Sequence, residues 1–193
     1  MIAKYKAIFL FLFLLLQTSA FGQDLKKAYF AGGCFWCMEE SFEKKEGVIE
    51  VISGYSGGTT ENPNYEEVTY GNTWHFETIE VVFDKNKTNF GELLSHFWKN
   101  INPFDEYGQF CDKGYSYRSV AFYKNNKEKD LIEKSIIKLE NRFKRKIVTY
   151  VRKFEKFYIA EKKHQDFYIE KFASYLRYKK ACGRERILNK IWN

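Results

Sequence analysis

The chain lacks internal repeats, low-complexity segments and any linker that would divide it. It also lacks an apolar run long enough to cross a bilayer, because the run Ala7–Leu16 is well short of the roughly 20 residues a membrane helix needs. The sequence therefore predicts a single folded domain, large enough to bury its own core, and no stable membrane anchor.

The first residues have the pattern of a secretory signal peptide. Lys4 and Lys6 precede the apolar run, small residues follow it, and no cysteine stands there to accept a lipid. Cleavage is expected after Ala20 or Gly22. We therefore expect a signal peptide over residues 1–22, a catalytic domain over residues 23–193, and export to the periplasm or the medium.

Dense charge of one sign is also absent. The 32 lysines and arginines exceed the 25 acidic residues to give a net charge of +7, but they are interspersed with acids. The densest basic run, residues 140–146, is expected at a helix end, where cations complement the helix dipole. We expect no nucleic-acid partner, and a monomer, because no large exposed apolar face is indicated.

Histidines and cysteines are too few and too scattered for a structural zinc site, which usually needs two close pairs of ligands. There is one CxxC pair, and the three histidines have no recognisable ligand spacing; the residues concerned are Cys34, Cys37, Cys111, Cys182, His75, His96 and His164. We expect no metal. Export to an oxidising space allows structural disulfides, but a Cys34–Cys37 bridge would close almost no loop and stabilise little.

Hydrophobic periodicity predicts an α+β fold. Strands are expected at 26–33, 48–55, 76–84, 118–123 and 146–153, helices at 34–47, 89–100, 127–144 and around 161–176, and one helical turn at 65–70. Their order predicts a two-layer sandwich with a mixed sheet on the split-βαβ (ferredoxin-like) plan. The long loops at 56–73 and 101–117 are expected to carry the active site.

The stretch GGCFWC places Cys34 at the start of a helix, a position that lowers a thiol's pKa. Gly32 and Gly33 allow close approach of backbone and substrate. Phe35 and Trp36 would place an aromatic surface beside the Cys34 sulfur, and such a surface suits an apolar, sulfur-containing group of a substrate. A general dithiol exchanger that uses Cys34 and Cys37 remains an alternative.

Four co-linear blocks resemble the A-type peptide-methionine sulfoxide reductases. They are GGCFWCMEESFEKKEGV, SGYSGG with NPNYEEVTYGNTWHFETIEVVFD, FCDKGYSYRSVAFY and AEKKHQDFY. Together they cover nearly all of residues 28–168 without a large insertion. The resemblance implies reduction of the S epimer of methionine sulfoxide, free or in proteins. A binding module of the same fold, without turnover, is a further alternative.

The resemblance also implies site residues. Cys34 attacks the sulfoxide sulfur, and Phe35 and Trp36 hold the substrate methyl group. The family's glutamate maps to Glu77 and its first tyrosine to Tyr65. The pattern D-x-G-x-x-Y-R-S maps to Asp112, Gly114, Tyr117, Arg118 and Ser119.

These residue types suit the reaction. A thiolate is a good nucleophile at sulfur, but oxide is a poor leaving group, so an acid must protonate the oxygen. Glu77 can serve if burial raises its pKa. Tyr65 and Tyr117 can donate hydrogen bonds to the same oxygen, and Asp112 can orient a substrate amide or a water.

Attack leaves Cys34 as a sulfenic acid, which a second thiol converts to a disulfide. The candidates are, in order, Cys37, Cys182 and Cys111. A thioredoxin-like reductant would then regenerate the thiols, and no cofactor is needed.

The chain departs from the family pattern at three places. Trp74 and Phe76 replace small residues beside Glu77, where they could narrow the mouth of the pocket. Residues 101–103 (INP) replace His-Asp-Pro, and residues 110–112 (FCD) replace Gly-Asn-Asp. These changes put the substrate range in question, not the reaction.

Overall fold

The computed structural model describes residues 24–193. The expected signal peptide lies outside the described residues. Within residues 24–193, none of the helices is both long and apolar enough to cross a membrane.

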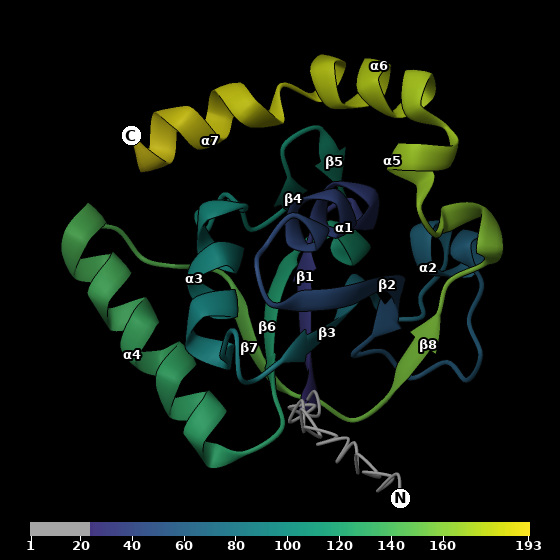
Figure 1. The fold of residues 1–193 in the computed structure, drawn as a ribbon. Coiled ribbons are helices and arrows are strands. Elements are labelled where there is room, and N and C mark those ends of the chain that lie inside the picture. Colours follow the sequence, from purple (N-terminus) through teal and green to yellow (C-terminus); the bar gives the residue numbers. More distant parts are fainter. Residues whose placement is uncertain (1–23) are drawn as a thin grey trace, which may run out of the picture.

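One mixed sheet of six strands, in the order β7-β6-β1-β3-β2-β8, forms the centre of the molecule (Figure 1). Its strands are β1 (Leu25–Gly32), β2 (Val48–Ser56), β3 (Phe76–Asp84), β6 (Ser119–Tyr123), β7 (Tyr150–Lys153) and β8 (Phe157–Ile159). All neighbours are antiparallel except β6 and β7. The central order β6-β1-β3-β2 is the split-βαβ arrangement, so the predicted fold is confirmed.

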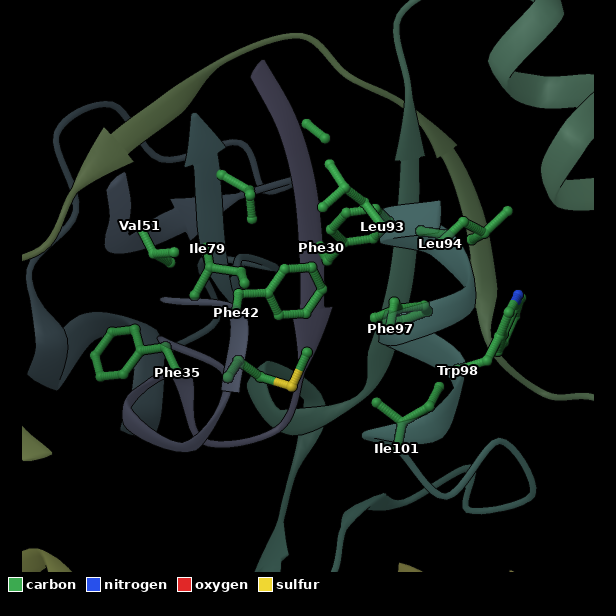
Figure 2. Packing of buried hydrophobic residues seen from close by; sticks show 14 of the residues in the cluster. Phe30, Phe35, Phe42, Val51, Ile79, Leu93, Leu94, Phe97, Trp98 and Ile101 are labelled. Atoms are coloured by element: carbon green, nitrogen blue, oxygen red, sulfur yellow. The ribbon is translucent and has the colours of Figure 1, made fainter. Parts of the chain in front are cut away.

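The α-helices are α1 (Phe35–Glu43), α2 (Tyr65–Tyr70), α3 (Phe90–Lys99), α4 (Asn126–Phe143), α5 (Phe167–Glu170), α6 (Phe172–Cys182) and α7 (Arg184–Trp192). Of these, α1, α3 and α4 place buried side chains in the main core on one face of the sheet. Figure 2 shows the core that α1 and α3 make with the strands. The Phe30 ring of β1 stacks on Phe42 of α1 at 5.4 Å and on Phe97 of α3 at 5.0 Å.

The alternation of side chains along β3 explains how a carboxyl comes to lie beneath α1. Successive residues of a strand point to opposite faces. Ile79, Val81 and Phe83 enter the core under the helices, whereas Phe76 packs in a second aromatic cluster on the other face. Glu77 is the second residue of β3 and lies two residues before Ile79, so its side chain points to the same face as that of Ile79. It therefore faces the start of α1.

Helix α7 and the following features were not predicted from the sequence. The edge strand β8 is only three residues long. The expected loop at 101–117 contains the hairpin β4 (Gly108–Gln109) and β5 (Asp112–Lys113) and the 3₁₀ helix η1 (Tyr115–Tyr117). The predicted helix near 161–176 is three separate segments: the 3₁₀ helix η2 (Lys162–His164), α5 and α6. Short elements like these depend on tertiary contacts more than on local pattern.

The chain ends in two helices that cross the molecule above α1 and the β4–β5 hairpin (Figure 1). Gly183 joins α6 to α7 with a φ of 67°, a left-handed conformation that glycine adopts without strain. The buried Arg184 fixes the junction, because its guanidinium donates a hydrogen bond to the carbonyl of Asn100 at 2.5 Å and stacks on Phe110. The C-terminal segment is thereby held against the end of the sheet where Cys34 lies.

Candidate active site

A small cavity of about 60 Å³ lies where β1 meets α1. The seven residues predicted for catalysis and substrate binding all line it, together with one that was not predicted: Cys34, Phe35, Trp36, Tyr65, Glu77, Asp112, Tyr117 and Tyr178. One water needs at least 10–15 Å³ of such space. The cavity therefore suits a group the size of a few waters, such as the end of a side chain. A larger hollow of about 810 Å³, beside Gly57 and Arg152, contains none of these residues.

Cys34 is the N-cap of α1 and is only 5% exposed. Gly33 before it has a φ of 79°, and a Cβ there would lie 2.5 Å from Gln109 Cβ, so only glycine fits the turn. The thiol lies in one buried cluster with Cys37 and Tyr175, and the Tyr178 ring packs against this cluster.

The expectation that the helix start lowers the pKa of Cys34 is wrong. Burial is the largest influence, and it raises the pKa of the thiol well above its usual value. The first free N–H of the helix, that of Phe35, donates instead to Glu77 Oε2 at 3.0 Å. Cys37 is 4% exposed, and its hydrogen bond with Cys34 lowers its pKa. Cys34 is therefore held as a thiol and needs a proton acceptor.

Glu77 has the properties of a general acid. It is 2% exposed, and burial raises its pKa to about 8 even though the Phe35 N–H and the Tyr117 hydroxyl favour the carboxylate. At neutral pH it therefore carries a proton, since a group is protonated below its pKa. This is the raised pKa that the sequence analysis requires of Glu77 as an acid, and its role in the reaction stays a prediction.

Two phenols complete the polar side of the cavity. Tyr65 begins α2, whose Asn64 and Glu67 form a capping box. Tyr65 and Tyr117 both line the cavity together with Glu77. Burial raises the pKa of both, so they remain hydrogen-bond donors throughout the physiological range.

The other side of the cavity is aromatic. Phe35 is buried among Tyr55, Tyr65 and His164, with ring centroids 5.4–6.4 Å apart. Trp36 stacks on Phe167 at 3.8 Å, almost parallel. Both rings are held by packing before any ligand binds, so they present a preformed apolar surface beside the Cys34 sulfur.

Asp112 opens β5 and is tied to the C-terminal helices. Its Oδ2 accepts a hydrogen bond from the Tyr178 hydroxyl at 2.5 Å, and burial raises its pKa. The residue before it, Cys111, forms a disulfide with Cys182 at the end of α6. Of the three candidate resolving cysteines, only Cys37 carries a free thiol in this form of the molecule.

Sequence reasoning missed Tyr178, Tyr175 and Arg184. Tyr175 and Tyr178 are three apart on α6, and both pack with the buried pair Cys34 and Cys37. Their spacing places them on one helix face, and Cys182 follows one turn later. This pattern is visible in the sequence, but the helix was predicted to end near Leu176.

The residues that depart from the family pattern do not line the cavity. Trp74 is 53% exposed with a φ of 60° and packs edge-on against Tyr115, and Phe76 is buried on the other face of the sheet. Ile101 is in the main core, and Phe110 packs on Arg184. The mapped residues Gly114, Arg118 and Ser119 also lie outside the cavity lining.

Comparison with known proteins gives one consistent family. The family model "Peptide methionine sulfoxide reductase" matches residues 26–193. The protein "Peptide methionine sulfoxide reductase MsrA" of Listeria monocytogenes serotype 4b is 46% identical over 172 residues, 88% of this chain and 97% of that protein.

Solved structures of methionine sulfoxide reductases have a fold similar to that of this chain. Methionine sulfoxide reductase A of Corynebacterium diphtheriae aligns with a TM-score of 0.69 and 29% identity over 77% of this chain and 76% of that chain. Mxr1 from Saccharomyces cerevisiae in reduced form aligns with a TM-score of 0.71 and 25% identity over 76% and 85%. The same yeast protein in complex with Trx2 shares the fold, with a TM-score of 0.53 and 19% identity over 76% and 90%.

The disulfide leads to a prediction about stability. It joins residues 71 apart, and a cross-link of that span stabilises a fold by about 4 kcal/mol in the chain-entropy picture. Replacing both Cys111 and Cys182 with serine should lower the free energy of unfolding by an amount of this order, measured by urea denaturation. Cys37→Ser, which breaks no cross-link, is the control. A loss below about 1 kcal/mol would contradict a structural contribution from the bridge.

Proposed function

Because this chain belongs to the peptide methionine sulfoxide reductase family, we propose that it reduces the S epimer of methionine sulfoxide with Cys34 as the nucleophile. The chain is an oxidoreductase that reduces methionine sulfoxide with electrons from thiols. The observation that carries the assignment of residues is the cavity that joins the Cys34 thiol to the buried acid Glu77. Free methionine sulfoxide and oxidised proteins are both proposed substrates.

In the first step the Cys34 sulfur attacks the sulfoxide sulfur while Glu77 gives its proton to the oxygen. Tyr65 and Tyr117 donate hydrogen bonds to that oxygen as its charge grows. The attack forms a transient bond between the two sulfurs as the S–O bond of the sulfoxide breaks; the released oxygen, as water, then bonds to Cys34 while the sulfur–sulfur bond breaks and methionine leaves with that electron pair. Methionine sulfur gains two electrons, and Cys34 loses two to become a sulfenic acid.

Cys37 is the proposed resolving residue. Its thiol is free, it contacts Cys34, and its pKa is lowered, so it can form the attacking thiolate. Attack on the sulfenic acid forms a Cys34–Cys37 disulfide and releases water. The other two candidates are bonded to each other and carry no thiol in this form.

A thioredoxin-like protein is the proposed reductant. The yeast relative Mxr1 has been solved in complex with Trx2, which supports this choice. No prosthetic group is required by the scheme, since the electrons pass through thiols. A monomer is sufficient, because a single chain supplies the whole cavity lining.

A general dithiol exchanger is the competing function. It requires sulfur atoms that a folded protein disulfide can reach, yet Cys34 and Cys37 are 5% and 4% exposed. A protonated buried glutamic acid also has no part in simple thiol–disulfide exchange. Both observations favour the reductase.

Mass spectrometry of a single turnover tests the function. The purified protein is mixed with one equivalent of methionine sulfoxide, each epimer separately, without reductant. The wild type should release methionine from the S epimer alone and lose two hydrogens. Cys34→Ser should release none.

The Cys37→Ser variant identifies the resolving cysteine in the same experiment. It should still release methionine but accumulate the sulfenic acid, about 16 Da heavier for the one added oxygen. A new disulfide in this variant would instead assign resolution to Cys111 or Cys182. If the wild type releases methionine from neither epimer while Cys34 remains reactive, the result favours the exchanger. If the protein binds methionine sulfoxide without releasing methionine, and Cys34→Ser still binds it, the result favours the binding module.

The raised pKa of Glu77 predicts an alkaline limb, a fall in rate at high pH, in the pH profile of the reaction. Its acid form exists below a pKa of about 8, so the single-turnover rate should fall as pH rises above that value. Glu77→Gln should reduce the rate at pH 7 by about 10²–10⁴-fold and remove this limb. Glu80→Gln is the matched control, because Glu80 is also buried on β3 but faces Tyr29 and Lys27. An unchanged limb in Glu77→Gln would exclude Glu77 as the acid.

Export is part of the proposal and has its own test. The charged start, short apolar run and small residues of positions 1–22 support it. The intact mass of protein recovered from outside the inner membrane should correspond to a chain that begins after Ala20 or Gly22. Recovery of the uncleaved chain in the cytoplasm alone would contradict export.

A further inference from the structure

The burial of the two thiols sets a requirement for the last step of the proposed cycle. Cys34 and Cys37 are 5% and 4% exposed, and the proposed reductant is a folded protein whose sulfur has to reach them. Thiol–disulfide exchange proceeds only by direct attack of one sulfur on another. The reductant therefore has to bind against the part of the chain that covers the two thiols.

Helices α5 and α6 supply most of that cover. Cys34, Cys37 and Tyr175 form one buried cluster. Four partly buried aromatic side chains pack against it: Trp36, Phe167, Tyr168 and Tyr178. Except for Trp36, these aromatic side chains come from α5 and α6, and α6 lies on the outside of the molecule (Figure 1). The cavity of about 60 Å³ at Cys34 is too small to admit another protein, so the cover itself is the surface that a protein partner meets.

A hollow of about 470 Å³, here called the α6 hollow, lies over this cover. Its lining includes Tyr175 of the thiol cluster and Glu40 of α1, which accepts a hydrogen bond from the Tyr175 hydroxyl. Glu40 is three residues after Cys37 on α1, so the two side chains lie on one face of that helix. Tyr175 therefore borders both the α6 hollow and the thiol cluster.

Two apolar side chains of this lining reach the solvent. Phe172 and Leu176 are four residues apart on α6, so they share a face of the helix, and they are 62% and 50% exposed. Ile169 of α5, just before them, is 57% exposed. No other stretch of eight residues in the part of the chain that the structure describes exposes three large apolar side chains. Exposed apolar side chains that gather in one place, unlike scattered ones, mark an interaction site.

The charged residues of the α6 hollow leave positive charge unpaired. Helix α6 carries three basic residues and no acidic one. Lys179 is paired with Glu40 at 2.8 Å and with Glu185 at 3.3 Å. Lys180 and Arg186 also line the hollow, but neither forms an ion pair with any residue of 24–193. These two cations favour a partner with acidic groups at the edge of its binding surface.

We propose that the α6 hollow, with Phe172, Leu176, Lys180 and Arg186, is the docking surface for the thioredoxin-like reductant. This inference rests on the proposed function. The partner is a dithiol protein with apolar surface around its reactive cysteine and acidic residues beside that surface. The position of the hollow over the thiol pair selects this partner, because the thiol pair is what such a protein has to reduce.

Reduction at this surface takes two exchange steps. A thiolate of the reductant attacks the Cys37 sulfur of the Cys34–Cys37 disulfide, and Cys34 leaves with the electron pair of the broken bond and takes up a proton. Tyr175 has to move aside for this attack, because it packs in one cluster with Cys37. The second thiol of the reductant then attacks the mixed disulfide as a thiolate, and Cys37 leaves and is protonated. The reductant loses two electrons and two protons as it becomes a disulfide, and the chain gains them.

Steady-state reduction of methionine sulfoxide by the full chain with two different reductants tests the docking surface. One reductant is a bacterial thioredoxin, kept reduced by its reductase and NADPH. The other is dithiothreitol, which is too small to need a docking surface. The double variant Phe172→Ser/Leu176→Ser should raise the KM for thioredoxin about tenfold or more, because a few exposed apolar side chains carry most of the energy of an interface. Its rate with dithiothreitol should stay within about twofold of the wild-type rate.

The charges of the docking surface have a separate signature. Reversing them in Lys180→Glu/Arg186→Glu should also raise the KM for thioredoxin. In the wild type this KM should increase with salt, since ions screen the attraction between the two surfaces. The charge-reversed variant should lose that dependence on salt.

Helix α4 offers matched control variants away from the α6 hollow. Leu131→Ser/Ile137→Ser removes two large apolar side chains that are 37% and 58% exposed. Lys134→Glu/Lys138→Glu reverses two exposed positive charges. Neither control should change the KM for thioredoxin.

Four results would overturn the docking surface. They are an unchanged thioredoxin KM in both α6-hollow variants, an equal loss of rate with dithiothreitol, the same rise in KM in the α4 controls, and wild-type turnover with dithiothreitol but not with thioredoxin. A wild-type dimer in analytical ultracentrifugation that Phe172→Ser/Leu176→Ser dissociates would also overturn it, by assigning the surface to a second copy of the chain.

Methionine release in a single turnover without reductant separates this inference from the proposed function. Its absence in the wild type would count against the proposed function. Release by the wild type, together with an unchanged thioredoxin KM in the variants Phe172→Ser/Leu176→Ser and Lys180→Glu/Arg186→Glu, would count against the docking surface alone.

Discussion

The contact between the Phe35 N–H and the Glu77 carboxyl is the constraint on which the site depends. It joins the first turn of α1 to the first residues of β3, and it places an acid beside the Cys34 sulfur. The Glu77 carboxyl accepts the hydrogen bond of the Phe35 N–H, which is then not available to a Cys34 thiolate. Burial keeps Glu77 protonated. The hydrogen bond therefore sets the position of the carboxyl, whereas burial keeps it protonated although the N–H favours the carboxylate.

The C-terminal helices supply what the sheet and α1 lack. Tyr178 of α6 lines the cavity and donates a hydrogen bond to Asp112, so this helix connects the cavity to the β4–β5 hairpin. Tyr175 and Tyr178 pack with Cys34 and Cys37, and the Cys111–Cys182 bridge fastens this helix to the loop that carries Asp112. The cross-link therefore has a local consequence for the site besides its effect on the unfolded chain.

The burial of both thiols also shapes the reaction. A small cavity lined by Phe35 and Trp36 admits the end of a side chain and excludes a folded disulfide. The departures from the family pattern leave this lining intact, because Phe76 faces the other side of the sheet and Trp74 packs on Tyr115 at the surface.

The sequence by itself determined the split-βαβ order of elements, the strand that carries Glu77 and the seven residues that meet at the cavity. Period-two alternation and co-linear motifs are local signals, so they place residues on a strand and on alternate faces without tertiary information. Only the tertiary structure decided the protonation of Cys34, the pairing of Cys111 with Cys182 and the entry of Tyr178. Each of these depends on which distant groups remove water from one another, and spacing along the chain does not encode that.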